Sequence, residues 1–229
     1  MKIIDAHSHI DYISHLFQND ISGTVVCATQ ESEWKMLIDL CAQDNNVYGA
    51  FGIHPWFVDF IRDGFDNNLK GILQNNCKYM VGEIGLDKYK PCMEKQMDVF
   101  IKEFNIAVEL KRTVFVHCVG AWDKMLHILK QYKKSDLPMI VFHAFDGGIQ
   151  IIDNLLENYE NNVMFSFGKN VVYGRNCNIE HIPLNKILVE SDGKQDVPLI
   201  NVVNKIAEIK KIEDVSDSIY NNTLRIVKK

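Results

Sequence analysis

The stretch Asp5-Ala6-His7-Ser8-His9 completes the first apolar run of the chain and decides how the fold is interpreted. A dinucleotide-binding sheet carries a glycine-rich turn after its first strand, whereas this chain has two histidines there. His7 and His9 are two residues apart, so in an extended segment both imidazoles point to the same side. Two imidazoles placed in this way can bind one metal ion of the zinc type. The start of the chain therefore predicts a metal site at a strand end.

The rest of the chain alternates short apolar runs with helix-length amphipathic segments. Eight runs rich in Val, Ile and Phe are expected to form strands, at residues 2–6, 24–28, 48–53, 80–84, 113–118, 139–144, 162–167 and 186–191. Seven segments are expected to form helices, at residues 31–44, 64–76, 91–111, 121–133, 149–158, 198–211 and 213–227. Such strands are typical of parallel sheets buried on both faces. The alternation predicts a single (β/α)8 barrel, or TIM barrel, over residues 1–229, with an open doubly wound sheet as the alternative.

Six residues of metal-binding type fall at or just beyond the ends of these strands. They are His7, His9, Glu83, His117, His143 and Asp192. In a (β/α)8 barrel the carboxyl ends of the strands converge on one face, where catalytic groups collect. Burial of six ionisable groups there would cost several kcal/mol each unless they were paired or bound to metal. The histidines His15, His127 and His181 match no strand end and are expected to be ordinary polar residues.

Six ligands exceed what one tetrahedral ion needs. A carboxylate can bridge, so two divalent ions ~3.5–4 Å apart with an activated water between them are expected. Their identity stays open among Zn, Mg, Mn, Fe and Ni. Asp5 shares a strand face with His7, and Glu190 shares one with Asp192. Each of these two carboxylates is expected either to orient a ligating histidine or to be a polar residue of the barrel rim.

The composition is that of an ordinary globular protein, with 47% apolar and 24% charged residues, which excludes disorder as the main state. No run approaches the ~18 apolar residues of a membrane span and no export signal is seen, so a cytoplasmic location is expected. The net charge of -5 and the lack of a basic tract exclude a typical duplex-binding module. The six cysteines form no Cys-x-x-Cys pair and are expected to stay reduced, with Cys118 directed into the core. No obligate protein partner is indicated.

Six segments extend the metal-binding pattern over most of the chain. They are Asp5-Ala6-His7-Ser8-His9, Gly52-Ile53-His54-Pro55-Trp56, Gly82-Glu83-Ile84-Gly85-Leu86-Asp87, Phe115-Val116-His117, Val141-Phe142-His143-Ala144-Phe145-Asp146-Gly147 and Leu188-Val189-Glu190-Ser191-Asp192. Together they resemble the TatD-type metal-dependent deoxyribonucleases of the amidohydrolase-like barrel superfamily. The His-x-His pair alone is a weak signal, but the segment at 82–87 combined with the other five is specific. The resemblance covers residues 5–192 and implies a (β/α)8 hydrolase with one to three divalent ions.

The resemblance also implies how the metal-binding residues divide their work. By this analogy His7, His9 and Asp192 would hold one ion, His117 and His143 would help hold a second, and Glu83 would bridge the two. Asp192 would orient or deprotonate the attacking water, which makes Asp192 and Glu83 the expected catalytic residues. His54 would lie near the substrate phosphate. Asp87 is expected to contact a ligand or to brace its loop. The implied reaction is removal of nucleotides from the 3′ end of single-stranded DNA, or cleavage of another phosphodiester.

The chain departs from the family pattern in two places. Cys118 and Val119 stand where the family commonly has Arg or another polar residue after the strand histidine. Ser191 precedes Asp192 and Gly193-Lys194 follow it, where the family commonly has Thr before and Pro soon after. Because a fold does not determine a substrate, two alternatives stay open. One is hydrolysis of a small amide, lactone or phosphoester on the same barrel, and the other is a non-catalytic barrel that binds metal for structure.

Overall fold

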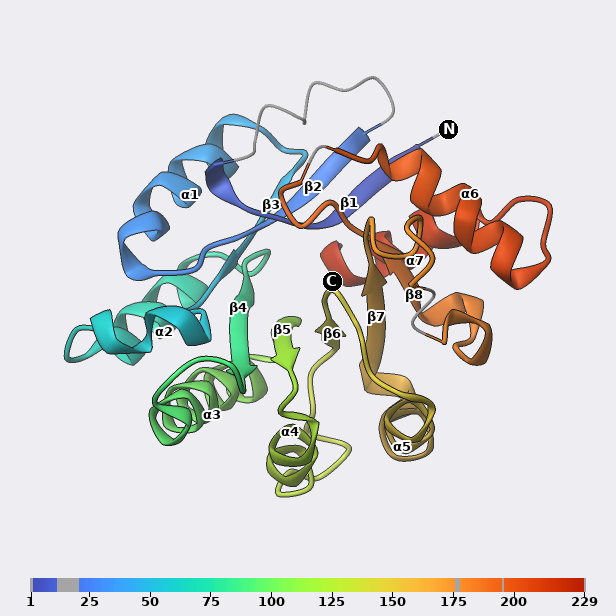
Figure 1. Cartoon of the computed structure of the whole chain (residues 1–229). Coiled ribbons are helices and arrows are strands. Elements are labelled where there is room, and N and C mark those ends of the chain that lie inside the picture. Colours follow the sequence, from blue (N-terminus) through green and yellow to red (C-terminus); the bar gives the residue numbers. More distant parts are fainter. Residues whose placement is uncertain (1, 12–20, 176–177, 195, 229) are drawn as a thin grey trace.

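The structure is a computed structural model that describes residues 2–11, 21–175, 178–194 and 196–228. Eight parallel strands form one sheet, and their order in the sheet is their order in the chain. The strands are β1 (Ile3–Ser8), β2 (Ile21–Cys27), β3 (Val47–Phe51), β4 (Met80–Asp87), β5 (Val114–Val119), β6 (Ile140–Phe142), β7 (Val163–Phe167) and β8 (Ile187–Val189). Figure 1 shows them as an inner ring with the helices outside. The predicted (β/α)8 barrel is confirmed.

Seven α-helices lie within the described residues, each at a predicted position. They are α1 (Glu31–Gln43), α2 (Phe65–Asn75), α3 (Met93–Leu110), α4 (Trp122–Leu129), α5 (Ile149–Tyr159), α6 (Leu199–Lys210) and α7 (Ser216–Val227). A 3-10 helix, η2 (Pro55–Phe60), follows β3. Helix α3 begins two residues after Pro91, because Cys92 adopts a left-handed conformation with φ of 62° and stands outside the helix. The predicted boundaries therefore need only small corrections.

The strands separate two layers of buried side chains. Phe115 belongs to a cluster inside the barrel, whereas its neighbours Val114 and Val116 belong to the layer between the strands and the helices. This alternation is the period of two expected for strands buried on both faces. The inner cluster is completed by Ile226 and Val227 at the end of α7. The inner layer is filled by apolar residues, so the polar groups of the barrel collect at the ends of the strands.

The seam between the first and last strands is closed by the residues that follow β8. Among the described residues, strand pairing runs from β1 to β8 but does not join β8 back to β1. Instead, the backbone N–H of Asp192 donates to the carbonyl of His7 at 3.0 Å. The carboxylate of Asp5 accepts from the N–H and the hydroxyl of Ser191, at 2.9 Å and 2.6 Å. The seam therefore brings His7 and Asp192 side by side although they lie near opposite ends of the sequence.

Two further expectations concern membranes and cysteines. No helix in the described part of the chain combines the length and the apolar character needed to cross a membrane. The cysteines placed by the structure are free thiols, and Cys118 is buried in the layer between strands and helices, as predicted. His15 and Cys177 lie outside the described residues.

Candidate metal centre

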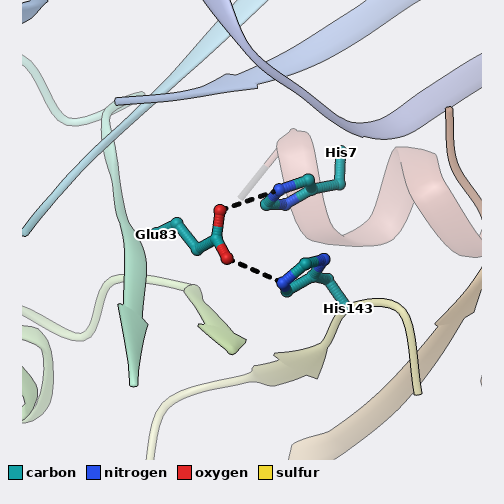
Figure 2. Close-up of side chains that lie close together, drawn as sticks. All are labelled: His7, Glu83 and His143. Carbon is teal, nitrogen blue, oxygen red and sulfur yellow. Dashed lines mark hydrogen bonds and ion pairs between the residues drawn. The ribbon is translucent and has the colours of Figure 1, made fainter. Parts of the chain in front are cut away.

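The site converges on Glu83, a buried residue of β4 that is 1% exposed. Five imidazoles approach its two oxygens within 3.5 Å, those of His7, His9, His54, His117 and His143. Oε1 lies 2.7 Å from His143 Nε2 and 2.9 Å from His117 Nδ1. Oε2 lies 3.1 Å from His7 Nε2. Figure 2 shows one oxygen of Glu83 directed toward His7 and the other toward His143. The carboxylate can therefore interact with two histidines at once.

The histidines reach Glu83 because their strands end at the same face of the barrel. His7 lies in β1 and His117 in β5, and His143 follows β6 directly. His9 comes one residue after β1, and its Nε2 lies 3.4 Å from Asp192 Oδ1 across the seam. The structure thus brings all six residues predicted as ligands into one cluster. This convergence follows from the parallel topology, in which the carboxyl ends of all strands share one side.

Three groups of side chains have donor atoms within 4.8 Å of one another, close enough to hold an ion. The groups are His7-His9-Asp192, His7-Glu83-His143 and His54-Glu83-His117. The first is the set that the family resemblance assigned to one ion. His117 and His143, which the resemblance assigned to a second ion, both face Glu83 Oε1, and their nearest ring nitrogens lie 3.1 Å apart; that they share an ion stays a prediction. Glu83 belongs to two groups, which is the geometry required of a bridging carboxylate.

The charges in the pocket are strongly coupled. Burial favours the neutral acid, but the histidines, His143 first, hold the pKa of Glu83 well below its usual range. Burial is likewise outweighed at Asp192, whose pKa is lowered by a hydrogen bond from His9 and by neighbouring histidines. Burial opposes protonation of His143, yet Glu83 raises its pKa well above the usual value. Burial and the charge of His143 lower the pKa of His7. The pocket therefore holds negative charge that a proton or a cation must balance.

The donor set fits divalent cations. His117 Nδ1 and His143 Nε2 lie 3.1 Å apart while both face Oε1 of Glu83. Ring nitrogens and a carboxylate oxygen this close need a proton or a cation among them, because a neutral imidazole nitrogen without hydrogen is an acceptor. His117 Nε2 is also buried with no hydrogen-bond partner among the described residues. Mixed imidazole and carboxylate ligands suit Zn, Mn, Fe, Ni or Mg.

Glu190 supports the centre from behind His143. Its Oε1 lies 3.5 Å from His143 Nδ1 and accepts the backbone N–H of Ala144 at 2.7 Å. A carboxylate on the far nitrogen of a ligating histidine orients the ring and raises its basicity. Asp5, the other residue expected in this role, accepts the backbone N–H of His7 at 3.2 Å and also holds the seam. Asp5 therefore holds the backbone of His7 by this hydrogen bond, whereas Glu190 faces the imidazole ring of His143.

Asp87, at the end of β4, braces its loop. Its Oδ2 accepts the indole N–H of Trp56 at 2.7 Å, and its Oδ1 accepts the N–H of Tyr89 at 2.9 Å. The backbone N–H of Asp87 donates to the buried amide of Gln96 on α3 at 2.8 Å. Oδ2 also lies 3.6 Å from His117 Nε2. The sequence analysis expected Asp87 either to contact a ligand or to brace its loop. These hydrogen bonds brace the loop, and the contact with a ligand stays a prediction.

His54 lies at the centre itself. Its Nε2 is 3.1 Å from Glu83 Oε1 and its ring is 4.4 Å from that of His117, while it also lines the cavity, and its contact with a substrate phosphate stays a prediction. Its position depends on Glu103 of α3, whose Oε1 accepts the N–H of Ile53 at 2.7 Å. The sequence analysis missed Glu103. The available signal was a glutamate on the face of the 91–111 segment that also carries Phe100, since residues three apart share a helix face.

The centre opens into a cavity of about 500 Å³. Its wall includes His9, His54, Trp56 and Asp192. Trp56 is 50% exposed, and the Lys90 ammonium lies 4.0 Å from the centre of its ring. His127 and His181 lie on exposed positions and belong to none of the three ligand groups, as predicted. Ions held by these groups would therefore face a cavity large enough for part of a substrate.

Eight parallel strands with imidazoles and carboxylates gathered at their carboxyl ends define a metal-dependent hydrolase of the (β/α)8 class. The family described as TatD related DNase matches residues 4–228 of the chain. The chain belongs to this family. The prediction of a metal-dependent hydrolase of the TatD nuclease type is confirmed at this level.

The chain aligns with different shares of its named relatives. The human 3'-5' RNA nuclease TATDN2 is 30% identical over 223 residues, which cover 85% of this chain and 29% of that protein. The 3'-5' ssDNA/RNA exonuclease TatD of Pectobacterium atrosepticum is 28% identical over 187 residues, which cover 78% of this chain and 70% of that protein. The chain thus spans less than a third of the human relative and over two thirds of the bacterial one.

Solved structures share the fold at lower identity. The Escherichia coli TatD homolog YJJV superposes with a TM-score of 0.86 at 22% identity, covering 99% of this chain and 98% of that one. A TatD family hydrolase from Entamoeba histolytica superposes with a TM-score of 0.81 at 15% identity, covering 98% and 97%. The likeness extends over whole chains, which agrees with the barrel described above.

Proposed function

We propose that the chain is a two-metal phosphodiesterase that removes nucleotides from the 3′ end of single-stranded DNA or RNA. The observation that carries the proposal is the convergence of five imidazoles on Glu83, with Asp192 beside His9. Two ligand groups that share one carboxylate match the paired-ion arrangement of enzymes that displace a phosphate ester oxygen. The relatives named as 3'-5' nucleases support this substrate class and polarity.

Divalent ions bound here would activate water for attack and neutralise charge on the phosphate. Glu83 would contribute to both ion sites, since its Oε1 faces His117 and His143 and its Oε2 faces His7 and His9. Asp192 would orient the attacking water and take its proton. Because its hydrogen bond with His9 keeps the pKa of Asp192 low against the effect of burial, the carboxylate would pass that proton on to solvent and stay ionised.

The chain's other polar groups position these residues. Glu190 holds the ring of His143 from the far side, and Glu103 fixes the loop that carries His54. Trp56 lies on the wall of the cavity and presents an aromatic face. Aromatic faces stack on the bases of single strands without sequence preference. The site would therefore combine ion-based chemistry with sequence-tolerant binding.

The test is hydrolysis of a single-stranded oligonucleotide labelled at its 5′ end, before chelation, after chelation and after return of Zn, Mn or Mg. Products that shorten stepwise from the 3′ end, loss of activity on chelation and recovery with metal are expected. Asp192→Asn should lower the rate about 10²–10⁴-fold. Asp39→Asn, on an exposed position of α1 paired with Lys35, is the matched control and should not change it.

Other outcomes would replace the proposal. Activity that survives chelation would remove the metal from the mechanism. Turnover of neutral amides or lactones with no cleavage of oligonucleotides would identify a small-molecule hydrolase. Tight metal binding with no turnover of any of these substrates would identify a non-catalytic barrel.

A further inference from the structure

A second cavity adjoins the metal-centre cavity and shares a wall with it. Its volume is about 320 Å³, and Ala144, Asp192 and Lys194 line both cavities. Its remaining lining includes Lys169 and Asn170 from the loop after β7. A molecule held at the metal centre can therefore extend past Lys194 into the second cavity.

The two cavities differ in the charge of their described lining residues. The carboxylates of the metal-centre cavity belong to Asp11, Glu33, Glu83 and Asp192, and Lys194 is its lysine. The cations of the second cavity belong to Lys169, Arg175 and Lys194. Its carboxylates belong to Asp146, Glu190 and Asp192; Asp192 lies between His9 and Lys194, and Glu190 faces His143. Cations and carboxylates are thus equal in number in the second cavity, whereas carboxylates outnumber the lysine in the metal-centre cavity, so the second cavity suits an anion better than the first does.

Lys169 and Lys194 are each placed at the second cavity by an ion pair with a nearby aspartate. Lys194 reaches the shared wall because Asp192 and Gly193 adopt positive φ values of 51° and 67°, which turns the chain back, and its ammonium donates to Asp192. Lys169 donates to Asp196 at 2.7 Å, and these two side chains are 31% and 47% exposed. Exposed ion pairs contribute little net stability. A phosphate can therefore take the place of Asp196 on Lys169 at small cost.

We propose that the second cavity binds the phosphate next to the scissile one in a nucleic-acid strand, with Lys169 and Lys194 as its cationic contacts. The inference rests on the proposed function. A strand carries one phosphate per nucleotide, so a strand with its scissile phosphate at the metal centre presents the next charge one nucleotide away. Lys194 lies on the wall between the two cavities and would contact the backbone where it crosses from one to the other.

The test compares three substrates of the metal-loaded enzyme. They are the dinucleoside monophosphate dTpdT, its 5′-phosphorylated form and its 3′-phosphorylated form. One added terminal phosphate should lower KM about tenfold, the effect of one charge-assisted contact. In Lys169→Met this advantage should fall toward onefold, and in Lys169→Arg it should be retained. Lys35→Met is the matched control, because Lys35 forms an exposed ion pair with Asp39 on α1, and it should keep the full advantage.

A second readout uses salt. The logarithm of KM for an oligonucleotide should depend on the logarithm of salt concentration with a slope smaller by about 0.7 in Lys169→Met, the value for one phosphate contact on a single strand. The proposal is overturned if neither terminal phosphate lowers KM in the unmodified enzyme, or if Lys169→Met behaves as Lys35→Met does. Absence of cleavage of every oligonucleotide tested would instead overturn the proposed function itself. Melting temperatures of the variants show that they are folded.

Discussion

Glu83 and Glu103 are both fully buried glutamates, yet the barrel shifts their pKa values in opposite directions. Glu83, at the carboxyl end of β4, meets five imidazoles, which outweigh burial and hold its pKa well below the usual range. Glu103, on α3, meets the N–H of Ile53, and burial raises its pKa well above the usual range. The difference shows that partners, and not depth, decide whether a carboxylate in this barrel is charged. Glu83 is thus favoured in the charged form that a cation needs, whereas burial favours the neutral form of Glu103, which accepts the N–H of Ile53.

Substitution of Glu83 should have the largest effect on hydrolysis and on metal content. Glu83→Gln removes the negative charge and places an amide N–H₂ against ring nitrogens that need an acceptor or a cation. We expect hydrolysis to fall by more than about 100-fold, beyond the usual effect of outer-shell ligand partners, together with loss of bound metal. Initial rates and elemental analysis of the purified variant measure both. Glu103→Gln serves as the control and should keep its metal content; a Glu83→Gln variant with normal metal and rate would contradict the assignment of Glu83.

A third buried glutamate sharpens the comparison, because Glu190 touches both kinds of partner. Its Oε1 accepts the N–H of Ala144 and faces Nδ1 of His143. In Glu190→Gln the amide oxygen can keep the backbone bond, while the charge behind the histidine is lost. Metal affinity should fall about 10–100-fold, as is usual when a carboxylate behind a ligating histidine is changed. Calorimetric titration with metal measures the change, and an unchanged affinity would show that Glu190 serves the backbone alone.

Substitution of Glu103 should have the smallest effect, a change in thermal stability that depends on pH. In the unfolded chain Glu103 ionises near a pKa of about 4.3, whereas in the folded chain burial keeps the proton on to higher pH. The folded state therefore binds more protons than the unfolded state above that pH, so stability falls as pH rises. Glu103→Gln does not ionise, and its melting temperature relative to the unmodified protein should rise from pH 4 to pH 8, by about 2–4 °C for each kcal/mol.

Thermal unfolding of both proteins across this pH range provides the measurement. Groups common to the two proteins cancel in the difference. Glu103→Leu is the control, because it leaves the N–H of Ile53 without its acceptor and should destabilise the fold by about 1–3 kcal/mol at every pH. A difference between Glu103→Gln and the unmodified protein that does not change with pH would show that Glu103 is ionised in the folded state.

Strand positions and ligand convergence could be predicted because they depend on local patterns joined by one topological rule. Apolar runs of strand length locate β1 to β8, and parallel strands must place their carboxyl ends together. His7 and His117 could be located in this way because they lie within strands. The division of the ligands between ions could not be derived from these patterns, since it depends on side-chain directions across the mouth of the barrel, and it stays a prediction of the family resemblance. His143 follows a strand of three residues, where alternation no longer determines direction.

The position of His54 beside Glu83 could not be predicted from the sequence. A histidine beyond a strand end can turn toward the centre or toward the substrate, and the choice is made by contacts from distant residues. The N–H of His54 donates to the carbonyl of Thr29 at 2.8 Å, and the preceding N–H is held by Glu103. These partners come from the loop after β2 and from α3. No local pattern around His54 contains them.

The seam at β1 and β8 passes through one of the three ligand groups. The group His7-His9-Asp192 takes two members from one side of the seam and one from the other, and Asp5 and Ser191 hold the two sides together. A cation bound to this group would therefore cross-link the first and last strands, and separation of these two edges would take Asp192 away from His7 and His9.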